Sequence, residues 1–316
     1  MKIKRLLEAA LEKNWNDKKA IIVLGPRQTG KTTLLMDLCT RFGNFLFLNC
    51  DDPETKIKLE NVNENRLIQM IGNHKIVFID EAQRIKNIGL TLKIITDRIK
   101  QTKLVVSGSS ALELANEINE PLTGRKWEYT LYPMSWNELV NHFGYMDASK
   151  QFEIRLIYGM YPEVVSNPGN ERNTLLQLSS SYLYKDLLSY RGMRKSELIE
   201  KLLRALALQL GNEVSYNELS RLLEVDKETV MNYIWLLEQA FVIYRLSPLS
   251  RNLRSEINTS RKIYFYDTGI RNALISDFRP LALRKDVGAL LENFIINERI
   301  KHTSYNQIYC NRYFWR

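Results

Sequence analysis

The amino-acid sequence predicts an α/β fold, with a doubly wound parallel sheet followed by a helical segment and a smaller domain of helices and strands. Five short apolar runs alternate with segments of helical periodicity over the first half of the chain, the pattern of such a sheet. A glycine-bounded loop joins the first apolar run to a helix. Further along, two amphipathic helices precede two strands, which predicts a winged helix.

A chain of 316 residues is long for one hydrophobic core, so we expect several domains. The changes of pattern along the chain give the following boundaries: an α/β core at 1–150, a helical segment at 151–206, a winged helix at 207–275 and a partial α+β segment at 276–316.

Composition excludes several classes of protein. Hydrophobic residues make up 45% and charged residues 26%, as in ordinary globular proteins. No stretch approaches eighteen uncharged apolar residues, so we expect no membrane partner. The first fifteen residues are too charged for a signal peptide and read instead as an amphipathic helix with one apolar face. That face comprises Ile3, Leu6, Leu7, Ala10 and Leu11.

The three cysteines, Cys39, Cys50 and Cys310, form no close pair in the sequence. The spacing therefore indicates neither a disulfide framework nor a zinc site. A reducing, cytoplasmic location fits this usage best.

The loop after the first apolar run, 20–24, has the spacing G-x-x-x-x-G-K-S/T and leads into a helix. Glycines at its two ends allow backbone conformations in which successive N–H groups wrap a phosphate. The lysine can reach the β- and γ-phosphates, and the hydroxyl that follows it can ligate Mg²⁺. We therefore predict a P-loop that binds ATP with Mg²⁺ through Gly25, Pro26, Arg27, Gln28, Thr29, Gly30, Lys31, Thr32 and Thr33.

The apolar run 75–79 ends in two carboxylates, Asp80 and Glu81. In a parallel sheet, ligands bind at the carboxyl ends of the strands. Asp80 is therefore expected beside the Mg²⁺ that Thr32 holds, and Glu81 is expected to orient or deprotonate an attacking water. This pair favours hydrolysis over a kinase or a simple switch.

A further run at 103–106 ends in small hydroxyl residues, where a sensor of the γ-phosphate would lie. Other apolar runs at 44–49 and 127–131 complete the five expected strands.

Five motifs follow one another along the chain: the phosphate loop, Ile79-Asp80-Glu81-Ala82-Gln83, Ser107-Gly108-Ser109-Ser110, Leu122-Thr123-Gly124-Arg125 and Leu131-Tyr132-Pro133-Met134-Ser135-Trp136-Asn137-Glu138. This ordered series resembles that of the prokaryotic AAA-type ATPases, usually described only as predicted ATP-binding proteins. The resemblance implies a helical lid, a winged helix and a C-terminal segment similar to restriction endonucleases.

The resemblance also implies roles for individual residues. Ser107 or Ser109 matches the sensor, and Asn49 matches a residue that restrains the catalytic glutamate. Arg125 matches an arginine finger offered to a neighbouring subunit, which would make the protein a homo-oligomer; the alternative is that it pairs with a local carboxylate. Pro162, in Gly159-Met160-Tyr161-Pro162, matches a lid residue that contacts adenine; the alternative is a plain helix-breaking turn.

In the expected winged helix, the first helix buries Leu219, Leu222 and Leu223, Asp226 caps the second, and the second buries Val230, Ile234 and Leu237. Duplex DNA is one expected partner, through Lys227 and Asn232 on the second helix and through a basic wing. The wing residues are Arg251, Arg254, Arg261 and Lys262. The second helix also carries acidic residues, which leaves an alternative open: a nucleotide-binding regulator that hydrolyses slowly, if at all, and whose winged helix docks a protein.

At the C-terminus, Asp286 is expected to cap a helix, and the resemblance aligns Glu292 with the first acidic residue of an endonuclease-like core. The sequence ends in an aromatic-rich strand before the further carboxylates that such a core needs. We therefore expect a truncated or incompletely covered chain, or a remnant tail, without a complete nuclease site.

Overall fold

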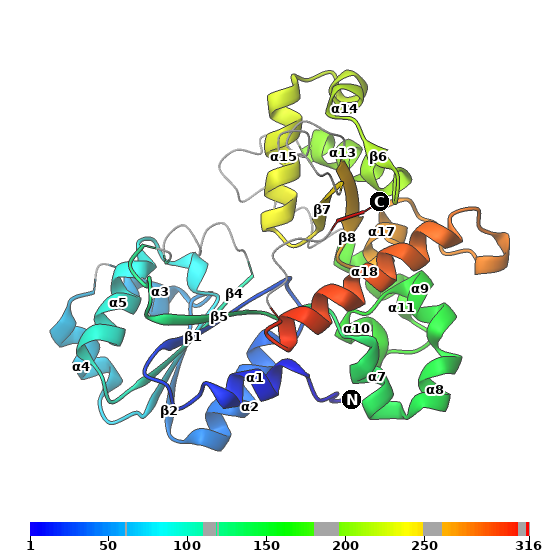
Figure 1. Ribbon diagram of the computed structural model, residues 1–316. Coiled ribbons are helices and arrows are strands. Elements are labelled where there is room, and N and C mark those ends of the chain that lie inside the picture. The colour runs from blue at the N-terminus through cyan, green and yellow to red at the C-terminus, as the bar shows by residue number, and fades with distance from the viewer. Residues whose placement is uncertain are drawn as a thin grey trace. The chain divides into compact units, whose positions relative to one another are not determined.

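The computed structural model describes residues 1–60, 62–109, 118, 120–179, 196–248 and 261–308, and the backbone of 314–315. The chain forms two compact units (Figure 1). The N-terminal unit is Arg5–Leu131, and the C-terminal unit is Met1–Lys4 together with Tyr132–Arg316.

The units divide at Leu131, whereas the sequence suggested a first boundary near residue 150. The reason lies in the segment that follows the sheet. Ser135 and Glu138 form a reciprocal capping box that starts a new helix, and Leu139 on that helix is buried in the core of the C-terminal unit.

A five-stranded parallel sheet with strand order β2-β3-β4-β1-β5 forms the centre of the N-terminal unit. The five strands coincide with the five expected apolar runs to within a residue or two. They are β1 (Ala20–Leu24), β2 (Phe45–Asn49), β3 (Ile76–Asp80), β4 (Lys103–Gly108) and β5 (Lys126–Thr130). Every residue of β1 and β3 is buried, as expected for strands covered on both faces.

Helices cover both faces of this sheet, as in other doubly wound folds (Figure 1). They are α1 (Leu7–Lys13), α2 (Lys31–Phe42), α3 (Pro53–Leu59), α4 (Glu64–Ile71), the 3₁₀ turn η1 (Ala82–Arg84) and α5 (Ile88–Arg98). Helix α1 begins only at Leu7, so Ile3 does not share its apolar face as predicted. Ile3 is buried instead in the C-terminal unit.

The first part of the C-terminal unit is helical. Its helices are α7 (Trp136–Phe143), α8 (Tyr145–Lys150), α9 (Phe152–Tyr158), α10 (Pro162–Ser166) and α11 (Glu171–Leu178). Apolar side chains of these helices, among them Leu139, form a core cluster together with Ile3, Met134 and Phe294.

The remainder of the C-terminal unit combines helices with a small mixed sheet of order β6-β8-β7-β9. The helices are α13 (Ser196–Leu208), α14 (Tyr216–Leu223), α15 (Lys227–Gln239), α17 (Thr268–Leu274), the 3₁₀ turn η3 (Leu281–Leu283) and α18 (Val287–Tyr305). The strands are β6 (Glu213–Val214), β7 (Ile243–Pro248), β8 (Arg261–Phe265) and β9 (Phe314–Trp315).

The helix–turn–helix expected from the sequence is formed by α14 and α15. Asp226 caps α15 as predicted, since its Oδ1 accepts a hydrogen bond of 2.7 Å from the backbone N–H of Thr229. The three apolar positions predicted on α15 are buried. On α14, Leu219 and Leu223 are buried, but Leu222 is 61% exposed and does not face inward as predicted.

The predicted cap of the last helix is wrong. Asp286 occupies the N-cap position of α18, but its carboxylate caps no backbone N–H there and instead binds the guanidinium groups of Arg271 and Arg284. Two buried arginines compete successfully for the carboxylate because each would be costly to bury without a partner.

In the part of the chain that the structure describes, no helix is long and apolar enough to cross a membrane.

Candidate nucleotide-binding site

The phosphate loop follows β1 and has a backbone that only glycine fits at its first position. Gly25 has φ +142°, and a Cβ built on it would lie 2.2 Å from the carbonyl oxygen of Leu131, at the end of β5. Gly30 has φ +90° and stands at the N-cap of α2. Gln28, between them, also has a positive φ of 54°. These turns fold the loop back over the start of α2, as a phosphate cradle requires.

Lys31 is buried at the first turn of α2, and its ammonium group donates to two carbonyls of the loop. The Nζ atom lies 2.9 Å from the oxygen of Gly25 and 2.8 Å from that of Pro26. The Thr29 hydroxyl donates to the Pro26 carbonyl at 2.8 Å. A positive charge is therefore held over the loop, where it can contact the β- and γ-phosphates of a nucleotide.

Arg5 is a further residue at this loop that the sequence did not single out. Its Nη1 donates to the carbonyl oxygen of Thr29 at 2.5 Å, and its side chain is buried. Arg5 is 24 residues away in sequence and precedes α1. No local motif relates it to the loop, so only the fold reveals the contact.

Thr32, Asp80 and Ser107 come together at the carboxyl edge of the sheet. The Thr32 hydroxyl donates to Oδ2 of Asp80 at 2.8 Å, and the Ser107 hydroxyl donates to Oδ1 of the same carboxylate. These three residues come from α2, β3 and β4, which supports the reasoning from parallel strands. The predicted metal ligands Thr32 and Asp80 are thus neighbours.

Glu81 follows Asp80 with a left-handed backbone, φ 53° and ψ 43°. Its Oε2 accepts hydrogen bonds from Gln83 Nε2 at 2.5 Å and from Ser109 Oγ at 3.0 Å. Its backbone N–H donates to the Ser107 hydroxyl at 3.2 Å. Two side chains, Gln83 and Ser109, therefore fix the position of this carboxylate, and Ser107 holds the backbone of the same residue.

Asn49 was expected to restrain Glu81, but its Oδ1 accepts a hydrogen bond from the backbone N–H of Asp51. The contacts to the Glu81 carboxylate come from Gln83 and Ser109 instead. Both residues belong to motifs seen in the sequence, and a polar residue two positions after the glutamate was the signal that could have identified Gln83.

The environment of Asp80 acts on its ionisation in opposite directions. Burial raises the pKa of the Asp80 carboxyl, and the charge of Glu81 raises it further, whereas the hydrogen bonds from Ser107 and Thr32 lower it. The net shift is upward. A cation at this edge would favour the ionised form, which is the form that ligates a metal.

The residues at this edge suit Mg²⁺. Magnesium is usually held by one or two protein oxygens together with phosphates and water, and not by a cage of protein ligands. The hydroxyl of Thr32 and the carboxylate of Asp80, 2.8 Å apart, supply such a pair. Among the described residues, no group of three or more His, Cys, Asp or Glu side chains forms a metal cage.

Two predicted site residues, Arg125 and Pro162, do not lie at the carboxyl edge of the sheet. Arg125 precedes β5 at the amino edge of the sheet, where its backbone carbonyl accepts from Ala20, the first residue of β1; the phosphate loop is at the carboxyl edge. Its guanidinium binds the carboxylate of Asp97 at 2.7 Å, the local pairing that the sequence left open. Pro162 is the first residue of α10 in the C-terminal unit.

The motif around Pro162 has a structural explanation within the C-terminal unit. Gly159 has φ +73°, and a Cβ there would lie 2.0 Å from Oδ1 of Asp267. Asp267 accepts a hydrogen bond from the backbone N–H of Met160 at 2.7 Å. The glycine is therefore needed so that this buried carboxylate can approach the turn. The contact of Pro162 with adenine stays a prediction.

The basic residues predicted for the wing are only partly described. Lys262 lies on β8, and its Nζ is 3.2 Å from Oε1 of Glu292, which also accepts a hydrogen bond from Tyr264. Arg261 is the first residue of β8. Arg251 and Arg254 lie outside the described residues.

Comparison with known proteins agrees with the nucleotide site. Residues 17–140 match the family model of the AAA domain, and residues 149–281 match a domain of unknown function (DUF8612). The chain is 27% identical over 309 residues to an uncharacterized protein of Mycobacterium tuberculosis, a match that covers 94% of this chain and 64% of the relative. An uncharacterized protein of Haemophilus influenzae is 27% identical over 277 residues, 80% of this chain and 68% of the relative.

Among solved structures, the Walker-type ATPase of Pyrococcus abyssi has a similar fold, with a TM-score of 0.58 at 15% identity over 85% of this chain and 94% of the other. This likeness concerns the fold alone. The match to the AAA domain and the geometry of the phosphate loop together support a nucleotide-binding site in the N-terminal unit. The chain spans 64% of the length of the mycobacterial relative.

Proposed function

We propose that this protein binds ATP with Mg²⁺, hydrolyses it, and couples the state of the nucleotide to its C-terminal unit. The observation that carries the proposal is the carboxyl edge of the sheet. There the hydroxyl of Thr32, the carboxylate of Asp80 and the held carboxylate of Glu81 adjoin the phosphate loop. A protein that only binds nucleotide has no need of a second, separately oriented carboxylate at this place.

Each residue of the site has a chemical role in the proposed reaction. Lys31 neutralises charge on the β- and γ-phosphates, and Thr32 and Asp80 hold Mg²⁺, which when bound polarises the same phosphates. Glu81 orients the attacking water and accepts its proton. Ser107 contacts both carboxylate residues and is the proposed sensor of the γ-phosphate.

Arg125 is proposed to complete the site of a neighbouring copy of the chain. Its side chain is 42% exposed and lies at the edge of the sheet opposite to its own phosphate loop. To act in trans, it would have to leave Asp97, and because exposed ion pairs contribute little, that exchange costs little. A homo-oligomer is part of this proposal.

The C-terminal unit is proposed to contain a winged helix. Support comes from the succession of α13, α14 and α15 and the antiparallel pair β7 and β8. Duplex DNA is the proposed partner, contacted through the basic residues around β8. The helical lid and the endonuclease-like segment at 276–316 are kept as parts of the same proposal.

A second candidate partner is a protein, and the exposed face of α15 favours it. Met231 and Trp235 are 42% and 39% exposed and stand one helical turn apart. Glu228 precedes them on the same face, and Asp226 stands at the N-cap. An apolar face with acidic neighbours repels phosphates and suits a basic, amphipathic protein segment.

ATP turnover separates these alternatives. We would measure it for wild type, Lys31→Ala and Glu81→Gln, each with and without duplex DNA. We expect both variants to lose turnover by at least about 100-fold, Glu81→Gln because general-base catalysis contributes that much and Lys31→Ala because it loses the charge that neutralises the phosphates. Glu81→Gln is expected to retain nucleotide, because the amide keeps the shape of the side chain. Unchanged turnover in Glu81→Gln would remove this residue as the base.

The same measurement tests the partner. Stimulation by DNA, lost as the salt concentration rises, would support the DNA proposal. Absence of both stimulation and salt-dependent retention on DNA would favour the protein partner, and a Met231→Ala, Trp235→Ala variant would then lose that interaction.

A further inference from the structure

The chain passes between its two units twice, at Lys4–Arg5 and at Leu131–Tyr132. In both places, the residue that belongs to the N-terminal unit, Arg5 or Leu131, contacts the phosphate loop. On the side of the C-terminal unit, Tyr132 directly follows Leu131 and is buried, and Ile3, which is also buried, is separated from Arg5 only by Lys4. These two connections lead from the loop to the same helix, α18.

The first connection runs through Arg5. Its guanidinium donates to the carbonyl of Thr29 at 2.5 Å. The C=O of Thr29 and the N–H of Gly30 share one rigid peptide plane, so this hydrogen bond also fixes the direction of the Gly30 N–H. That N–H belongs to the turn that cradles a phosphate. Arg5 is thus placed to respond when the loop adjusts to an anion.

On the other side of Arg5, Ile3 is 5% exposed and belongs to the core cluster of the C-terminal unit. Met134, Leu139 and Phe294 are members of the same cluster. Phe294 lies on α18. Only Lys4 separates the buried isoleucine from the arginine. Because the reach of so short a segment is fixed, a movement of Arg5 would also displace Ile3.

The second connection runs through Leu131. Its carbonyl oxygen occupies the space beside Gly25, and its N–H donates to the carbonyl of Leu24 at 2.8 Å. The next residue, Tyr132, donates its N–H to the hydroxyl of Tyr305 at 3.1 Å, and the two rings are 6.0 Å apart. Tyr305 is the last residue of α18.

We infer that Arg5 is a positioning residue of the nucleotide site and that, together with Leu131, it couples occupancy of the phosphate loop to the stability of α18. This inference rests on the proposed function, because it needs a nucleotide on the loop. Nucleotide on the loop would make local opening of α18 less frequent, because the two connections hold this helix at Phe294 and at Tyr305.

Hydrogen exchange of the full chain tests the inference. Exchange of the α18 amides is measured with and without a non-hydrolysable ATP analogue and Mg²⁺, and binding of the same analogue is measured separately. In wild type, we expect nucleotide to slow exchange in α18 by at least about fivefold, the lower end of ordinary coupling between sites. In Arg5→Met, at saturating nucleotide, the slowing is expected to disappear.

Two further variants make the result specific. Ile3→Ala leaves the bond between Arg5 and Thr29 in place but weakens the anchor in the C-terminal unit. It is expected to keep the affinity of wild type and to lose most of the α18 response. Arg98→Met is the matched control, because Arg98 is 68% exposed and only 3.8 Å from Glu64 in a surface ion pair. It is expected to respond as wild type does.

The outcomes are distinguishable. A wild type that binds no nucleotide overturns both the proposed function and the coupling. A wild type that binds nucleotide without any change in α18 overturns the coupling alone, as does an Arg5→Met variant that binds and responds fully. If Arg5→Met does not fold, Ile3→Ala decides, and a full response in that variant is evidence against the coupling.

Discussion

At the scale of single residues, Glu81 combines an unfavourable backbone with a firmly held side chain. Its left-handed conformation costs roughly 1–2 kcal/mol for a residue with a Cβ. The hydrogen bonds that its carboxylate accepts from Gln83 and Ser109, and the one that its backbone N–H donates to the Ser107 hydroxyl, offset part of that cost. Strain of this kind persists only where the surroundings impose one geometry, and it is common at functional sites.

Ser109 is expected to matter for catalysis because it holds Glu81. Ser109→Ala removes one of two donors to the carboxylate, so the proposed base can turn away from the water. We expect kcat to fall about 10- to 100-fold with little change in KM. Steady-state ATPase kinetics would measure this, with Ser149→Ala, on an exposed helix of the C-terminal unit, as the control. An unchanged kcat would contradict the role.

Gly25 is expected to tolerate no side chain. In Gly25→Ala, the new Cβ would lie 2.2 Å from a backbone oxygen, which cannot move aside without distorting β5. We expect a loss of about 3 kcal/mol or more in the free energy of unfolding. Gly124→Ala is the matched control, because Gly124 also has a positive φ but has nothing within 4 Å of the new Cβ. Urea denaturation of both variants would show whether crowding or backbone strain dominates.

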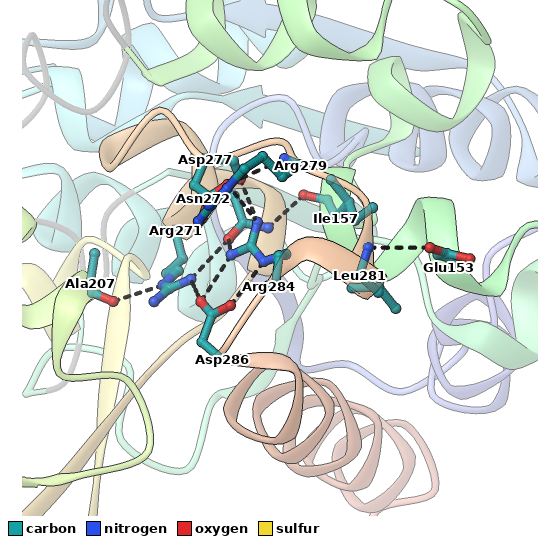
Figure 2. Close-up of polar contacts among 10 residues, drawn as sticks. All are labelled: Glu153, Ile157, Ala207, Arg271, Asn272, Asp277, Arg279, Leu281, Arg284 and Asp286. Atoms are coloured by element: carbon teal, nitrogen blue, oxygen red, sulfur yellow. Dashed lines mark hydrogen bonds and ion pairs between the residues drawn. The ribbon is translucent and has the colours of Figure 1, made fainter.

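At the scale of elements, a buried ionic network joins four helices of the C-terminal unit (Figure 2). Arg271, on α17, binds the Ala207 carbonyl at the end of α13 and the carboxylate of Asp286. Arg284, with a fully buried side chain, binds the same carboxylate at 2.9 Å. Asn272 donates to the Ile157 carbonyl of α9 at 2.7 Å. The network therefore fixes where α18 starts relative to α9, α13 and α17.

Removing the shared carboxylate should be far more damaging than removing an exposed one. Asp286→Ala would remove the carboxylate that two buried guanidinium groups share and leave Arg284 only the longer pair with Asp277 at 3.5 Å, so we expect a loss of about 3–5 kcal/mol in the free energy of unfolding. Asp147→Ala, in an exposed pair with Lys150, serves as the control and should change stability very little. Chemical denaturation compares the two. A small effect of Asp286→Ala would show that the network is not needed for stability.

The same network predicts how the free energy of unfolding depends on pH. Burial alone would raise the pKa of the Asp286 carboxyl, but hydrogen bonds from Arg284 and Arg271 outweigh it and lower that pKa. The hydrogen bond from Arg279 likewise lowers the pKa of Asp277. A carboxyl with a depressed pKa stabilises the fold above its ordinary pKa, near 3.9, and the stabilisation is lost as the pH falls through the folded value. Denaturation between pH 5 and pH 2 should therefore show a steeper loss in wild type than in Asp286→Asn.

These elements also show what the sequence can predict. Local patterns were sufficient for the five strands, the phosphate loop and the cap at Asp226, because each depends on residues a few positions apart. The pairing of Asp286 with Arg271, of Arg125 with Asp97 and of Arg5 with Thr29 was not predictable in this way, since the partners are 15, 28 and 24 residues apart. The sequence shows that a buried charged residue would need a partner, but it does not show which residue that partner is.

At the scale of the whole molecule, each unit has its own core, and two buried cysteines report on one of them. Cys39 and Cys50 lie in the N-terminal unit, and both are free thiols. Burial raises the pKa of each thiol to about 12. At pH 9 only about one native thiol in a thousand would be ionised, compared with a large fraction in an unfolded chain. Alkylation at this pH therefore reports opening of the N-terminal unit.

We predict that nucleotide slows this alkylation. A ligand that binds only the folded unit stabilises it by about 2.7 kcal/mol at 100 times its dissociation constant, which reduces the open population about 100-fold. Labelling of Cys39 and Cys50 with iodoacetamide, resolved by mass spectrometry, should therefore slow by up to that factor when ATP and Mg²⁺ are added. Lys31→Ala should show no such protection, because it lacks the cation that holds the phosphates.

Equal protection in both proteins would mean that nucleotide binds without Lys31. Labelling of native wild type at the unfolded rate would mean that the two thiols are not buried. Because both cysteines belong to the N-terminal unit, the same experiment separates stabilisation of the nucleotide site from any change in the C-terminal unit.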